Sequence, residues 1–287
     1  MKMAFLVTAH SNFKHLKLLM SILDTGKDDV FLHIDKRAKR VPSPSELHHP
    51  YMLERQVVHW AGFSQVVVTN RLFKEAINVS DADYFVFISG TDYPVRPIEE
   101  LRAYLLSSGL NHINVRDGFV DGQNIQKLIK FHPEYTRRNP RLISTQFWRV
   151  VERLGKKYFP DKKPPFPLYT GHNWCALKRD AVKYILDIVE KNKAYEEFFK
   201  YTNSPDEAYH QTILGNSSFR GSVAPYLTYT DWTGVEKPAY ITEEHVELLK
   251  KNMKFETEFG IQEVFFARKF HDKLDHVVRK IDKELLA

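Results

Sequence analysis

The sequence predicts an α/β fold in which helices cover both faces of a largely parallel sheet. Short, almost wholly apolar segments alternate along the first half of the chain with amphipathic patterns of helical length. Such an alternation is typical of parallel sheets, because each parallel pairing needs a crossover and apolar strands of this kind are buried on both sides. The expected strands are residues 3–8, 30–35 and 84–89, and the expected helices are residues 13–23, 63–77 and 98–106.

The second half continues the pattern less regularly. A short strand at 113–115 closes the first half; the expected strands of the second half are residues 173–178 and 225–229, and its expected helices are residues 180–190, 243–251 and 269–286. One further helix starts at Ser204, where Ser-Pro-Asp-Glu has the spacing of a capping box that closes through Glu207. The Pro-rich run at 162–167 marks an excursion from the sheet. We therefore expect one domain, residues 1–287, with a basic insertion around 117–169.

Positive charge is concentrated in that insertion. Residues 127–163 contain eleven Lys or Arg against three Asp or Glu, a net charge of +8, whereas the whole chain carries +6. A helical pattern that begins near Asn139-Pro140 places five apolar residues on one face, namely Ile143, Phe147, Val150, Val151 and Leu154. Four cations lie mostly away from this face, namely Arg149, Arg153, Lys156 and Lys157. They form either a solvated basic face or a docking surface for an anionic partner, such as a lipid surface, an acidic glycan or a nucleic acid.

The single cysteine, Cys175, allows no disulfide within the chain and fits a reducing compartment. No apolar run approaches the 18 residues of a membrane-spanning helix. We expect a cytoplasmic protein, with peripheral contact at the inner face of the cell membrane if the basic segment meets anionic lipid.

Three polar residues follow predicted strands and indicate a ligand site. In parallel sheets ligands bind beyond the carboxyl ends of the strands, where His10, Asp35 and Asp92 are expected. Two of them have a structural alternative, because Asp35 suits a strand end and Asp92 suits a turn before Tyr93-Pro94.

A carboxylate and a pair of cations supply the chemistry. Glu207 lies at the predicted helix start, where the helix dipole favours the ionised form that a general base needs. Arg268 and Lys269 lie between two phenylalanines and can stabilise negative charge on a departing diphosphate, although an ordinary basic helix start is the alternative. A base with a cation pair suits the transfer of a group from a diphosphate.

The sequence does not predict a metal centre or a nucleotide-binding glycine loop. Asp81-Ala82-Asp83 has the form of a metal-binding pair but precedes its strand, so we expect a connector there. The thirteen histidines lack zinc-ligand spacing, and no Walker or Gly-x-Gly-x-x-Gly pattern is present.

Eight short blocks in a fixed order resemble one known family nearly from end to end. They are FLVTAH (5–10), LHIDKR (32–37), WAGFS (60–64), ISGTDYP (88–94), TGHNW (170–174, with Arg179), SPDE (204–207), DW (231–232) and FARKF (266–270). The chain resembles the Core-2/I-branching β-1,6-N-acetylglucosaminyltransferases and the peptide O-xylosyltransferases, and looks like a bacterial member.

This resemblance implies an inverting, metal-independent glycosyltransferase of GT-A type that uses a UDP-sugar and needs no cofactor. Glu207 corresponds to the family's general base, and Arg268 and Lys269 to the cations that hold the leaving diphosphate. The nucleotide-binding positions are Thr8, His10 and Asp35, and the donor-sugar or acceptor positions are Asp92, His172, Trp174, Asp206 and Trp232. Glu247 stands near the place of a second cation of the N-acetylglucosaminyltransferase branch, so the adjacent Arg268-Lys269 pair is closer to the xylosyltransferase pattern.

The expected reaction moves a sugar, such as GlcNAc or a xylose-like one, to a hydroxyl of a glycan or lipid-linked glycan in cell-surface polysaccharide synthesis. One alternative is a non-enzymatic protein that grips a polyanion or glycan with residues 127–163, whose aromatic residues interleave with cations. Another is a glycoside hydrolase that uses Asp206 or Glu207 with Asp92. No nucleic-acid partner is expected for the transferase.

Overall fold

The computed structural model describes residues 1–118, 122–134, 143–233 and 235–287. The strands of its main sheet are β1 (Met3–Ala9), β2 (Asp29–Ile34), β3 (Tyr51–Met52), β4 (Tyr84–Ser89), β6 (Asn111–His112), β9 (Cys175–Lys178) and β10 (Val223–Ala224). They lie in the order β10-β6-β9-β4-β1-β2-β3. β1 pairs in parallel with β2 and β4, while β9 runs antiparallel between β4 and β6. The predicted α/β class with a mostly parallel sheet is confirmed.

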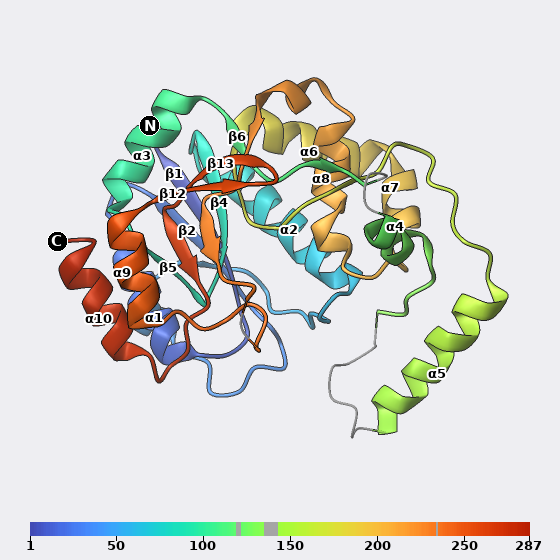
Figure 1. The fold of residues 1–287 in the computed structure, drawn as a ribbon, viewed down its shortest axis with the longest axis horizontal. Coiled ribbons are helices and arrows are strands. Elements are labelled where there is room, and N and C mark those ends of the chain that lie inside the picture. The colour runs from blue at the N-terminus through green and yellow to red at the C-terminus, as the bar shows by residue number, and fades with distance from the viewer. Residues whose placement is uncertain (119–121, 135–142, 234) are drawn as a thin grey trace.

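Helices cover both faces of this sheet (Figure 1). One core contains residues of α1 (Phe13–Leu23), α3 (Ile98–Ser108), α9 (Glu243–Lys251) and α10 (Asp275–Glu284). The other contains residues of α2 (Phe63–Val79), α6 (Arg179–Lys191), α7 (Lys193–Phe199) and α8 (Tyr209–Gly215). Phe5 and Val7 of β1 enter the first core, and Ala4 and Leu6 enter the second. Side chains alternate between the faces of a strand, so a strand buried on both sides has an unbroken apolar sequence.

Smaller sheets flank the main one. β5 (Asp92–Pro94), β11 (Thr228–Thr230) and β14 (Phe266–Arg268) form a three-stranded sheet in the order β11-β14-β5. Two ribbons pair β7 (Arg116–Asp117) with β8 (Tyr169–Thr170), and β12 (Lys254–Thr257) with β13 (Gly260–Glu263). Single 3-10 turns occur at Pro44–Leu47, Pro205–Glu207 and Ser218–Ser222.

The basic insertion predicted at 117–169 contains α4 (Gly122–Ile129) and α5 (Ile143–Tyr158). Leu128 of α4 belongs to the second core, whereas α5 extends away from the body (Figure 1). The helix start expected at Asn139-Pro140 lies outside the described residues.

Two expected strands are wrong in position. The strand expected at 113–115 lies instead at Asn111–His112, because tertiary contacts satisfy these polar side chains. Asn111 Oδ1 accepts a hydrogen bond from Lys178 N at 2.9 Å, and His112 Nδ1 lies 3.1 Å from Pro225 O. The strand expected at 225–229 lies at Thr228–Thr230, where it pairs with β14.

The helix expected at 269–286 begins six residues later, at Asp275. Arg268 ends β14 instead, since residues 266–268 pair with β5 on one side and β11 on the other. The expectation of a basic helix start at Arg268 and Lys269 is therefore wrong.

Gly171 provides a test of the packing beside Glu207. A Cβ placed on Gly171 would lie 1.9 Å from Asn114 O, so the backbone must shift. We expect Gly171→Ala to lower the free energy of unfolding by about 3 kcal/mol, as overpacking of a rigid site does. Chemical denaturation monitored by circular dichroism measures the change. Gly221→Ala is the matched control, because nothing lies within 4 Å of its Cβ; equal effects of the two substitutions would contradict the prediction.

Candidate functional site

The predicted nucleotide-binding residues lie at the carboxyl ends of β1 and β2. Thr8 is near the end of β1, His10 follows that strand, and Asp35 follows β2. The His10 imidazole is within electrostatic range of both Asp35 and Arg268. The parallel register therefore brings segments from opposite ends of the chain to one edge of the sheet.

Asp35 is buried and its carboxylate is fully engaged. It accepts hydrogen bonds from Arg37 N at 2.7 Å, from Arg37 Nη2 at 2.8 Å and from Val58 N at 3.1 Å. Burial favours the neutral acid, but the hydrogen bonds from Arg37 and Val58 outweigh it and lower the pKa of Asp35. Asp35 thus fixes the loop after β2 as an ionised group.

A buried ion pair joins β5 to β14. Arg268 Nη1 lies 3.3 Å from Asp92 Oδ1, in a register where Arg268 pairs with Asp92 across β14 and β5. The Arg268 guanidinium stacks on Trp174 with 4.1 Å between its central carbon and the ring centre. Burial raises the pKa of Asp92 to about 6, although the charge of Arg268 opposes this shift. Burial therefore favours the neutral acid at Asp92, and the guanidinium of Arg268 favours its carboxylate.

Lys269 has a more open environment than Arg268. Its Nζ lies 3.1 Å from Glu236 Oε2 and 4.5 Å from the centre of the Tyr240 ring. The Glu236 side chain is 62% exposed, so this ion pair is weak and easily exchanged for a stronger anion.

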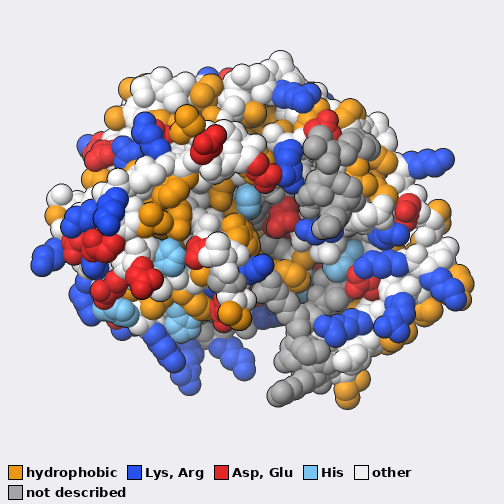
Figure 2. All heavy atoms as spheres, viewed as in Figure 1, with side chains coloured by type: hydrophobic (Ala, Val, Ile, Leu, Met, Phe, Trp, Pro, Cys, Tyr) orange, Lys and Arg blue, Asp and Glu red, His pale blue; other side chains and the backbone are white. Residues whose placement is uncertain are grey.

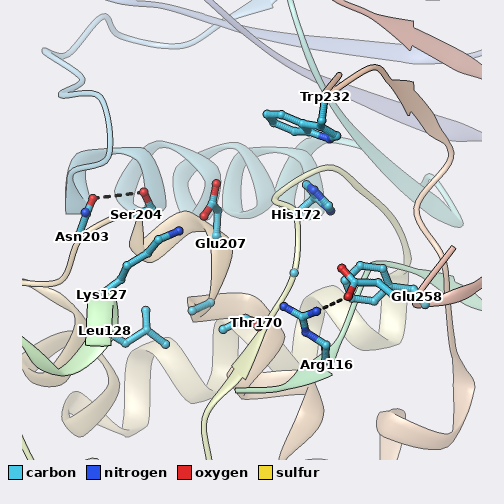
Figure 3. A pocket seen from close by; sticks show the side chains of 13 residues that line it. Arg116, Lys127, Leu128, Thr170, His172, Asn203, Ser204, Glu207, Trp232 and Glu258 are labelled. Atoms are coloured by element: carbon cyan, nitrogen blue, oxygen red, sulfur yellow. Dashed lines mark hydrogen bonds and ion pairs between the residues drawn. The ribbon is translucent and has the colours of Figure 1, made fainter. Parts of the chain in front are cut away.

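Glu207 lies at the end of a short 3-10 turn and not in a capping box. Ser204 adopts a left-handed conformation, with φ of 53°, and its hydroxyl makes no cap hydrogen bond. Glu207 N instead donates to the Ser204 backbone oxygen at 3.1 Å, and α8 begins only at Tyr209. The capping-box prediction is wrong, and the carboxylate of Glu207 is left facing a cavity (Figure 3).

Asp206 lies beside Glu207 but does not line that cavity. Its Oδ2 accepts hydrogen bonds from Gln65 Nε2 at 3.1 Å and Asn173 Nδ2 at 3.0 Å. Burial and then the charge of Glu207 raise the pKa of Asp206 to about 7. Two neighbouring carboxyls in a desolvated site share protons, so each influences the ionisation of the other.

Burial raises the pKa of Glu207 as well, which makes it a stronger base. The positive charge of Lys127 opposes this shift. Figure 3 shows the Lys127 side chain extending from α4 toward Glu207. The basic insertion thus supplies one cation to the site.

An aromatic wall borders the same cavity. His172 stacks on Tyr226 with 4.8 Å between ring centres and on Trp232 with 6.0 Å. Burial, helped by Arg116 and Arg268, lowers the pKa of His172 to about 4, so its ring is neutral. Flat, neutral rings of this kind provide the apolar faces on which a sugar ring can pack.

The cavity collects residues from many segments. They are Arg116, Lys127, Leu128, Thr170, Gly171, His172, Asn203, Ser204, Glu207, Ala208, Trp232, Glu258 and Phe259. Of the predicted site residues, the cavity holds Glu207, His172 and Trp232. Trp174 connects this group to Arg268 and Asp92, because its ring centre lies 6.1 Å from that of His172.

Sequence reasoning missed several residues of this cavity, including Lys127, Phe259 and the ion pair between Arg116 and Glu258. They come from the start of β7, from the insertion and from the turn of the β12–β13 ribbon. No local pattern marks them, apart from the general excess of positive charge after residue 127.

Within the described ranges, no three His, Cys, Asp or Glu residues lie close enough to hold a metal ion. Asp81 and Asp83 lie before β4, where Asp81 pairs with Lys2 Nζ at 2.9 Å and Asp83 accepts a hydrogen bond from Lys2 N. They form the predicted connector.

The sequence is similar to known glycosyltransferases over nearly its whole length. It is 23% identical to Xylosyltransferase 2 of Mus musculus over 98% of this chain, and 21% identical to Xylosyltransferase sqv-6 of Caenorhabditis briggsae over 96%. The match covers 33% and 35% of those proteins, so the chain spans about a third of their length. Among solved structures, the galactosyltransferase LgtC, in complex with donor and acceptor sugar analogues, has 10% identity and a TM-score of 0.41 over 92% of this chain and 87% of that one.

A model of one protein family, described as "Branch: Core-2/I-Branching enzyme", matches residues 3–259. The matched part includes Glu207 and the aromatic wall, and it ends before Arg268 and Lys269. The predicted resemblance to this family is confirmed. The chain belongs to the Core-2/I-Branching enzyme family.

Proposed function

We propose that the chain transfers a sugar from a UDP-sugar to a glycan hydroxyl, with inversion at the anomeric carbon and without a metal ion. The observation that carries this proposal is the position of Glu207. It is a carboxylate that opens onto a cavity with aromatic and polar walls, next to a buried second carboxyl and opposite a lysine. Such a carboxylate is suited to remove a proton from a bound hydroxyl.

In the proposed step, Glu207 accepts the proton of the acceptor hydroxyl. The hydroxyl oxygen forms a bond to the anomeric carbon as the bond from that carbon to the diphosphate oxygen breaks, and the electron pair leaves with UDP. Attack opposite the leaving group turns an α-linked donor into a β-linked product. Trp174 contacts both His172 of the Glu207 cavity and the Arg268 guanidinium, so the proposed base and the proposed leaving-group cation are connected through one side chain.

Arg268 and Lys269 replace a metal ion in this proposal. A preorganised donor aimed at developing charge contributes about 3 kcal/mol to the transition state. In the structure the two cations pair with Asp92 and Glu236. Lys269 exchanges its exposed partner, Glu236, for a phosphate of the donor. Arg268 stays paired with Asp92 and stabilises the negative charge of the diphosphate without changing its partner.

We further propose a GlcNAc or xylose-like donor and a glycan or lipid-linked acceptor of cell-surface polysaccharide synthesis, with the enzyme in the cytoplasm. The xylosyltransferase relatives and the adjacent Arg268-Lys269 pair support this donor class. The hydrolase alternative is weakened because Asp92 is held by Arg268 and is absent from the Glu207 cavity. The polyanion-binding alternative gives no role to Glu207.

Replacing Glu207 tests the base. We expect Glu207→Gln to lower kcat by about 100-fold to 10,000-fold, because general-base catalysis is lost while the shape of the side chain stays. Calorimetry with UDP should give an unchanged Kd. Glu244→Gln is the matched control, since Glu244 is exposed on α9. A kcat equal to that of the wild type in Glu207→Gln would contradict the proposal that Glu207 is the general base.

Replacing Lys127 tests the electrostatics of that base. Lys127 lowers the pKa of Glu207, so Lys127→Gln should move the acidic limb of the kcat/KM profile to higher pH. The activity lost at low pH should return as pH rises, because the base is then ionised again. Lys130→Gln provides the control, because Lys130 lies in the same insertion, pairs with Asp161 and does not line the cavity. An identical profile for both variants would contradict the role of Lys127.

Titration of the protein with UDP in excess EDTA tests metal independence. We expect binding in EDTA that manganese does not improve, and we expect Lys269→Gln to weaken it about tenfold through loss of one charge-assisted contact. Lys273→Gln, a nearby exposed lysine, should bind UDP as the wild type does. Binding that appears only with manganese would show that Arg268 and Lys269 do not replace a metal.

A further inference from the structure

In the described part of the chain, helix α5 packs on the body through the side that carries Thr145, Glu152 and Gly155. Gly155 packs against Phe131 so closely that a Cβ on it would lie 2.2 Å from the ring. One turn earlier, Glu152 Oε1 lies 3.1 Å from His132 Nδ1, and Thr145 on the same side is buried. These contacts fix the rotation of α5 about its axis, and the helix extends outward from there (Figure 1).

The opposite side of α5 is an exposed apolar stripe. It consists of Ile143, Phe147, Val150, Leu154 and Tyr158, which are 88%, 59%, 53%, 48% and 68% exposed. Their spacing of three and four residues places them within about 80° of arc on the helix. Amphipathic helices of globular proteins turn such a stripe toward the core, but here it faces solvent.

Two cations flank one edge of this stripe, because Arg153 and Lys157 lie about 100° and about 60° from its centre, whereas Arg149 and Lys156 lie further round the helix. Arg149, Arg153, Lys156 and Lys157 are all exposed, and Figure 2 shows Lys and Arg side chains together with hydrophobic ones over α5. The only acid of the helix, Glu152, faces the body and pairs with His132 and Lys156. The outward surface of α5 is therefore apolar and positively charged, with no negative charge of its own.

We propose that α5 binds an anionic lipid surface, lying in the plane of the interface with the apolar stripe among the acyl chains. Exposed aromatic and aliphatic residues supply the apolar contact, and the neighbouring Arg and Lys side chains reach the headgroups. Both parts are needed, because a short stripe or a few cations alone give only weak binding. No helix in the described ranges has the length and apolar character to cross a bilayer.

Charge favours lipid over a second copy of the chain as the occupant. Two α5 helices that paired through their stripes would bring Arg153 and Lys157 of each copy together, and like charges at an interface are repelled. Anionic headgroups neutralise the same cations.

Vesicle binding tests the proposal. We expect the wild type to float with phosphatidylcholine vesicles that contain phosphatidylglycerol, and to bind pure phosphatidylcholine at least about tenfold more weakly. The triple substitution Phe147→Ser, Val150→Ser and Leu154→Ser should reduce binding about tenfold or more. The triple substitution Arg149→Gln, Arg153→Gln and Lys157→Gln should reduce it similarly and remove most of its salt dependence.

The matched control changes three exposed apolar residues elsewhere, Val79→Ser, Leu106→Ser and Ile261→Ser, and should keep full binding. The stripe variant should retain the wild-type melting temperature, because its side chains are exposed in the folded state. Wild-type binding by the stripe variant would overturn the proposal. So would a wild type that ignores vesicles but self-associates through α5 in sedimentation experiments. Glu207→Gln should bind vesicles as the wild type does, because Glu207 is not part of α5. Vesicle binding therefore tests the role of α5 separately from the proposed catalysis.

Discussion

The buried ion pair between Asp92 and Arg268 is the interaction on which the rest of the site depends. It connects residues 176 positions apart in the chain, at the pairing of β5 with β14. Trp174 stacks on the guanidinium of this pair, and His172 lies beside Trp174 in the aromatic wall. Removing one member of a buried pair costs far more than the pair contributes, because the other charge is left without a partner. The sheet edge, the cations and the cavity are thus held in one arrangement.

The site is assembled from charges with different degrees of burial. Arg268 and Asp92 are fixed in the interior, whereas Lys269 and Lys127 lie near solvent and can adjust to a ligand. The insertion contributes at both of its helices, because α4 directs Lys127 toward Glu207 while α5 carries its exposed apolar and basic surface outward. One excursion from the sheet therefore serves the cavity and the outer surface together.

Elements with strong local patterns could be predicted from the sequence almost to the residue. The helices at Phe13–Leu23 and Glu243–Lys251 and the strand at Tyr84–Ser89 have the predicted bounds, because their own apolar spacing determines which face is buried. Asn111 and His112 form a strand only because distant backbone groups satisfy their side chains. Arg268 is in a strand because two other strands pair with it. Likewise, the proximity of Lys127 to Glu207 arises from packing between segments 80 residues apart, which no local pattern encodes.

Burial of the Asp206 carboxyl couples its protonation to folding. Its pKa is about 7 in the folded protein and near 3.8 in an exposed carboxyl, so between these values the folded chain holds a proton that the unfolded chain has released. The stability that this group contributes is complete below pH 3.8 and is lost as pH rises through 7. The base beside it requires the opposite change, since it works only when ionised. The rise in pH that ionises Glu207 for catalysis therefore also removes the stability that protonated Asp206 contributes.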